Sequence, residues 1–130
     1  MIGAIDVIVD LQRRYAADWD GQAPIREDII AWTRGSEEAE AVLYDDLGAE
    51  LARGYHAKRY SFDFCDAVVN QLSALLIEKQ MLEPPPPWPK LFWRVYEAFD
   101  AGEFANPSKP TYDPIKTETD PAIAEIVREL

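Results

Sequence analysis

Apolar residues recur along most of this chain at intervals of three and four, the spacing typical of α-helices that bury one side. The clearest case is residues 2–19, where a helical wheel separates an apolar side from a charged side. The apolar side consists of Ile5, Ile8, Val9, Leu11, Tyr15, Ala16 and Trp19. Because β-branched residues at 7–9 favour extended backbone, a short strand at residues 4–9 is the alternative there.

The same spacing, together with residues that begin and end helices, predicts further helices along the chain. Serines precede two of them as candidate N-caps, and glycines follow others as candidate ends. The predicted helices lie at residues 24–34, 37–54, 62–81, 90–101 and 121–130, with a proline-rich connector at 84–89 and a loop at 103–119. We therefore expect one domain over residues 1–130, an all-α bundle of five or six short helices.

The length and the hydrophobic content fit one soluble domain with a single hydrophobic core. The chain has 130 residues, of which 48% are hydrophobic, enough apolar area for one compact domain. Its apolar runs fall far short of the roughly 20 residues that cross a bilayer, and its N-terminus lacks the pattern of a secretory signal. These features favour a cytoplasmic protein without a membrane partner.

The net charge of the chain and its scarcity of cysteine and histidine exclude several classes of function. A net charge of −11 makes nucleic acid a poor partner, because cations supply most of the affinity for phosphate backbones. Cys65 is the one cysteine of the chain and His56 is its one histidine. The chain therefore lacks the residues for a disulfide within itself or for a zinc site built from cysteine and histidine. Cys65 lies on an apolar helical stripe, so we expect it to be buried and unreactive. Phosphate-binding loops and the common hydrolase motifs are missing.

Two surface features then suggest protein binding. Between residues 36 and 50 there are six carboxylates and no lysine or arginine. These are Glu37, Glu38, Glu40, Asp45, Asp46 and Glu50. Trp93 lies opposite the main apolar stripe of its helix, as an interface anchor would. We expect a non-enzymatic domain that binds another, basic protein, in the manner of small acidic inhibitors and immunity proteins.

A second interpretation is enzymatic. The pairs Glu37-x-x-Glu40 and Asp63-x-x-Asp66 resemble the paired acidic motifs of the all-α nucleoside triphosphate pyrophosphohydrolases, although Asp63 stands where that family usually has glutamate. The resemblance implies a magnesium cofactor held by these four carboxylates beside a triphosphate. Hard oxygen ligands of this kind suit magnesium.

A third interpretation is self-association. On the predicted helix 62–81, Ile77 and Met81 lie on the side opposite the main apolar stripe. A helix that is apolar on two sides is either central in its bundle or contacts a second chain. The sequence thus leaves a homo-oligomer through Ile77, Met81 and Trp93 as the third possibility.

Overall fold

The computed structural model describes residues 2–104, 108–109 and 111–130. These residues form six α-helices and one π-helical turn, with no strand among them, and about 75% of the structure is helical. The helices are α1 (Ala4–Gln22), α2 (Arg26–Thr33), α3 (Glu37–His56), α4 (Phe62–Gln80), α5 (Lys90–Ala101) and α6 (Asp120–Glu129), and η1 (Ile115–Thr119) directly precedes α6. The all-α prediction is confirmed, and residues 4–9 belong to α1 rather than to a strand.

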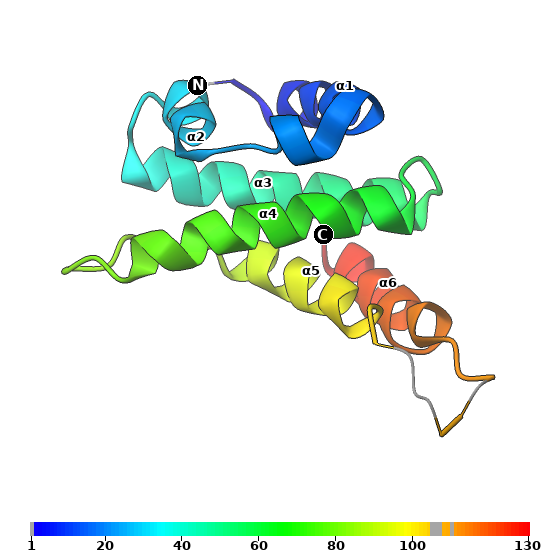
Figure 1. Ribbon diagram of the computed structural model, residues 1–130. Helices are drawn as coiled ribbons and strands as arrows, with labels where there is room; N and C mark the ends of the chain where they lie inside the picture. Colours follow the sequence, from blue (N-terminus) through cyan, green and yellow to red (C-terminus); the bar gives the residue numbers. More distant parts are fainter. Residues whose placement is uncertain (1, 105–107, 110) are drawn as a thin grey trace.

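The helices are arranged around the antiparallel pair α3 and α4. In Figure 1, α1 and α2 cover one side of this pair, and α5 and α6 cover the other. Helix α3 contacts α1, α2, α4, α5 and α6, so it is the central helix of the bundle. Helix α5 packs against both α3 and α4. No helix in the described part of the chain combines the length and the apolar character that crossing a membrane requires.

The two predicted serine N-caps are confirmed by hydrogen bonds. The Ser36 hydroxyl accepts from the Ala39 N–H at 3.2 Å, and the Ser61 hydroxyl accepts from the Phe64 N–H at 3.1 Å. Each side chain therefore satisfies one of the free N–H groups at the start of its helix. The predicted loop at 103–119 instead ends in η1, while residues 105–107 and 110 of that loop lie outside the described residues.

The crossing of α3 and α5 fixes the position of α5. A Cβ atom on Gly48 would lie 2.9 Å from the Phe92 Cα, so the two helices approach closely at this glycine. The Tyr44 ring meets the Phe92 ring edge to face at 4.8 Å. Both rings are fully buried. This crossing holds α5 beside α4 and determines which α5 side chains face solvent.

The face that α1 buries differs from the predicted one. Helix α1 buries Val7, Ile8 and Leu11, whereas Ile5 and Val9 are exposed. The apolar residues of this segment occupy more than one side of the helix, so packing against α3 and α4 decides which side is covered.

Cys65 is fully buried in the core, as predicted. Burial, with a smaller contribution from the charge of Asp66, raises the pKa of the thiol to about 12. Since the thiolate is the reactive form, this side chain has the character of an inert core residue.

Candidate functional site

The acidic block of residues 37–50 is divided by the fold between solvent and the interior. Its exposed members are Glu37, Glu38 and Asp46. Asp45 Oδ1 accepts a hydrogen bond from the Phe92 N–H at 3.0 Å, in the first turn of α5. Glu50 Oε1 accepts from the Tyr60 hydroxyl at 2.8 Å, so its carboxylate secures the loop after α3. Asp45 and Glu50 are therefore already occupied within the fold.

Glu40 is the most deeply buried carboxylate of the block, with a 4% exposed surface. Its two oxygens form ion pairs with Arg26 of α2, at 2.5 Å, and with Lys79 of α4, at 2.9 Å. Arg26 also donates to the Leu75 carbonyl at 2.6 Å. These contacts join three helices, and Glu40 has no surface to offer a partner protein.

The four carboxylates proposed as magnesium ligands do not converge. Glu37 and Glu40 lie at the start of α3, and Asp63 and Asp66 at the start of α4. Glu40 contacts Lys79, which follows Asp63 by 16 residues, or about 24 Å along a helix. Within the described ranges, no three Asp, Glu, His or Cys side chains are grouped as a metal site requires.

A different arrangement of side chains lies where α4 and α5 pack together. Trp88 precedes α5, and its ring centroid lies 5.0 Å from that of Trp93, which in turn lies 4.7 Å from that of Tyr96. Trp88 has 37% of its surface exposed. Trp93 and Tyr96 are half-buried. Three aromatic rings thus form a continuous row that is partly open to solvent.

Carboxylates continue this row toward the end of α5. Spacings of three and four residues place Trp93, Tyr96, Asp100 and Glu103 along one side of α5 and its extension. On the antiparallel α4, Asn70 donates to Glu103 Oε1 at 3.1 Å. The row therefore runs from aromatic rings at one end to carboxylates at the other.

Asp66 of α4 joins this acidic end. Its carboxyl group lies close to that of Glu103, and the interaction between the two groups contributes to a raised pKa of Asp66. Its Oδ1 is buried and has no hydrogen-bond partner among the described residues. Asp66 is thus partly removed from water and faces other carboxylates.

The α4–α5 face, as we call this surface, also includes exposed apolar side chains near the end of α4. Ile77 has 47% of its surface exposed and Met81 has 82%. The face is defined by Asp66, Asn70, Ile77 and Met81 from α4 and its C-cap, and by Trp88, Trp93, Tyr96, Asp100 and Glu103 from α5 and its flanks. Its apolar end lies at the connector between the two helices, and its acidic end lies where α4 begins and α5 ends (Figure 1).

Burial and the proximity of the carboxyl groups to one another raise the pKa values of the acidic end. Burial, followed by the hydrogen bond with Glu103 and the charges of Glu103, Asp100 and Asp63, raises the pKa of Asp66 to about 7. The hydrogen bond with Glu103, followed by burial, raises the pKa of Asp100. Among the described residues, none of Asp66, Asp100 and Glu103 forms an ion pair with a lysine or an arginine. The acidic end is therefore a cluster of carboxylates without a cation of its own.

Comparison of the chain with protein families, with curated proteins and with solved structures gives no match.

Several residues of this face had been singled out by the sequence pattern: Trp93 as an interface anchor, Ile77, Met81 and Trp93 together as a self-association surface, and Asp66 as a magnesium ligand. The position of Tyr96 and Asp100 on the same side of α5 follows from helical spacing and was available from the sequence. The approach of Asp66 to Glu103, which are 37 residues apart, depends on how α4 and α5 pack.

Replacing Asp66 with asparagine should stabilise the protein at pH 8 and flatten its stability between about pH 4 and pH 7. The folded protein binds this proton more tightly than the unfolded chain, so the free energy of unfolding falls as the pH rises through that window. Because the carboxyl group is partly solvated, we expect about 1–2 kcal/mol at pH 8, well below the full conversion of a shift of this size.

Urea unfolding of the parent and Asp66→Asn at pH 5.5 and pH 8 measures this effect. Asp63→Asn, an exposed carboxylate one turn earlier on α4, is the matched control and should change the free energy of unfolding by less than about 0.5 kcal/mol. A parent protein that is equally stable at both pH values would contradict the prediction.

Proposed function

We propose that this protein is a non-enzymatic acidic domain that binds a basic partner protein through the α4–α5 face. The observation that carries the proposal is the acidic end of that face, where carboxylates gather without a cation beside a row of partly exposed aromatic rings. An arrangement that costs the isolated protein stability is relieved when a partner supplies positive charge.

The aromatic row suits the same kind of partner. Tryptophan and tyrosine are the side chains most often found as anchors of protein interfaces, because they bury a large rigid area. Trp88, Trp93 and Tyr96 also present ring faces on which an arginine side chain can stack. A partner segment that carries arginine next to apolar residues complements both ends of the face.

The overall charge supports rapid encounter with such a partner. A net charge of −11 attracts a basic protein over long range, and exposed carboxylates such as Glu37 and Glu38 contribute to this field without touching the partner. The proposed role is that of a cytoplasmic inhibitor or immunity-type protein, which neutralises a cationic target by covering it. The same charge opposes pairing of two copies through this face, because their acidic ends would repel.

The proposal predicts separate effects of charge and aromatic variants on binding kinetics. With a basic partner isolated from the native host, Asp100→Asn with Glu103→Gln should lower the association rate constant roughly threefold or more at low salt. Trp93→Ala should mainly raise the dissociation rate constant, by about 30-fold, which corresponds to about 2 kcal/mol. Surface plasmon resonance at low and high salt measures both constants.

The matched control is Glu37→Gln with Glu38→Gln, which removes the same charge from the exposed first turn of α3. This control should change the association rate less than the variant in the acidic end, and neither should alter the helical circular dichroism spectrum. Equal effects of the two charge variants, together with no effect of Trp93→Ala, would assign the α4–α5 face no role in binding.

A further inference from the structure

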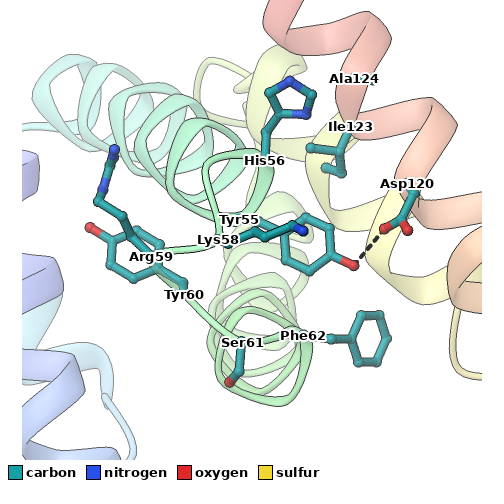
Figure 2. A pocket seen from close by; sticks show the side chains of 10 residues that line it. All are labelled: Tyr55, His56, Lys58, Arg59, Tyr60, Ser61, Phe62, Asp120, Ile123 and Ala124. Atoms are coloured by element: carbon teal, nitrogen blue, oxygen red, sulfur yellow. Dashed lines mark hydrogen bonds between the residues drawn. The ribbon is translucent and has the colours of Figure 1, made fainter.

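A hollow of about 710 Å³ lies on another part of the molecule, between the end of α3, the loop that leads to α4, and the start of α6. Figure 2 shows Tyr55, Lys58, Phe62 and Asp120 around it, with Arg59 and Tyr60 together at its other side. A volume of this size is within the range of small-molecule sites. None of the residues of the α4–α5 face lines it.

Cationic side chains are concentrated at this hollow. The chain has 13 lysines and arginines, and three of them, with the one histidine, occur within residues 53–59. His56, Lys58 and Arg59 line the hollow itself. His56 and Lys58 form no ion pair with the described residues. The ion pair of Arg59 with Glu50 is long, at 3.4 Å, and its guanidinium lies over the Tyr60 ring, 5.7 Å from the ring centroid. Positive charge therefore remains available in an otherwise acidic protein.

Lys58 occupies a backbone position that normally belongs to glycine. Its φ angle is 64°, in the left-handed region. The Lys58 N–H donates to the Tyr55 carbonyl at 3.0 Å, and the Arg59 N–H donates to the Gly54 carbonyl at 2.7 Å, which is the Schellman pattern at a helix end. A glycine here would relieve the strain, so the lysine side chain costs the fold some stability at this position.

A fixed hydrogen-bond acceptor lies across the hollow from these cations. Asp120 Oδ1 accepts a hydrogen bond from the Tyr55 hydroxyl at 2.6 Å. Burial and this bond raise the pKa of the Tyr55 hydroxyl, which therefore remains a donor. The bond holds the Asp120 carboxylate at the edge of the hollow (Figure 2), where its remaining lone pairs can accept from hydroxyl groups of a ligand.

We propose that this hollow binds a small phosphorylated ligand of the size of a nucleoside monophosphate, with its phosphate at Lys58 and its hydroxyl groups at Asp120. The rings of Tyr55, Tyr60 and Phe62 give the hollow the apolar walls that a planar group of such a ligand packs against. The net charge of −11 does not prevent this, since charges farther than about 10 Å are largely screened at 0.1 M salt. The site is independent of the proposed partner face.

The single histidine provides a direct test. In one-dimensional proton NMR of the full chain, adenosine monophosphate at constant pH should shift the two imidazole C–H resonances of His56 in a saturable way, and adenosine at the same concentrations should not. Absence of a saturable shift with adenosine monophosphate, or an equal affinity for adenosine, would overturn the proposal.

Variants of Lys58 separate binding from folding. Lys58→Gly removes the charge and suits the left-handed backbone, so it should raise the melting temperature while weakening adenosine monophosphate binding at least tenfold. Lys58→Asn, which also tolerates this conformation, should weaken binding to the same degree. Unchanged affinity in both variants would overturn the assignment of the phosphate to Lys58.

Discussion

Replacement of Gly48 with alanine should lower the free energy of unfolding by about 2–3 kcal/mol, although the same change in the middle of a helix usually stabilises by up to about 1 kcal/mol. The added Cβ would lie 2.9 Å from the Phe92 Cα. Because the contacted atom belongs to the backbone of α5, no side-chain rotation relieves the overlap, and the two helices must separate.

Separation of α3 from α5 would also weaken the contacts on either side of this glycine. The edge-to-face pair of Tyr44 and Phe92 and the hydrogen bond from the Phe92 N–H to Asp45 both span the crossing. Gly48→Ala should therefore reduce the cooperativity of unfolding around α5 as well as the total stability. Urea unfolding, followed by circular dichroism and by tryptophan fluorescence, measures both.

Gly21→Ala in α1 is the matched control for this experiment. A Cβ on Gly21 would also meet a close neighbour, but that neighbour is the carboxylate of Asp18, the end of a side chain that can rotate away. We expect a change of less than about 1 kcal/mol there. A Gly48→Ala variant as stable as the parent would show that α3 and α5 do not need this close approach.

The helices were predictable from the sequence because their signals are local. Ser36 and Ser61 cap the following helices through hydrogen bonds that span only three residues, so a short segment carries the whole signal. Gly102, one of the glycines expected to follow a helix, does lie at the end of α5. Its backbone is in the right-handed helical conformation, and a Cβ there would overlap Thr119 and the Phe62 ring. That glycine is required by packing between distant segments, which spacing along the chain does not reveal.

The candidate site was less predictable because its environment is assembled over long sequence separations. The partners of Glu40 and Asp45, which are Arg26, Lys79 and Phe92, lie 14 to 47 residues away. A run of carboxylates without lysine or arginine therefore looked uniformly exposed in the sequence. Conversely, the cluster around Asp66 and Glu103 forms only when α4 and α5 pack side by side.

The stability of a Glu40→Ala variant decides whether Glu40 stabilises the fold or belongs to a surface that binds a partner. Glu40→Ala should lower the free energy of unfolding by about 3 kcal/mol, because it leaves Arg26 and Lys79 close together in a partly buried site without their shared anion. Glu38→Ala, in the same turn of α3 but exposed, should cost less than about 1 kcal/mol. Urea unfolding at pH 7 compares the two variants directly.

Two further measurements test whether the lost stability comes from unpaired charge and whether Glu40 contributes to binding. Combining Glu40→Leu with Arg26→Met and Lys79→Met should recover most of the lost stability, since replacing all members of a buried ionic group with apolar side chains avoids unpaired charge. At a temperature where Glu40→Ala is still folded, its association rate with a basic partner should change no more than that of Glu38→Ala, because Glu40 is buried. If Glu40→Ala instead cost no more stability than Glu38→Ala and slowed association more, Glu40 would belong to the docking surface and the ion pairs that join α2, α3 and α4 would contribute little to the fold.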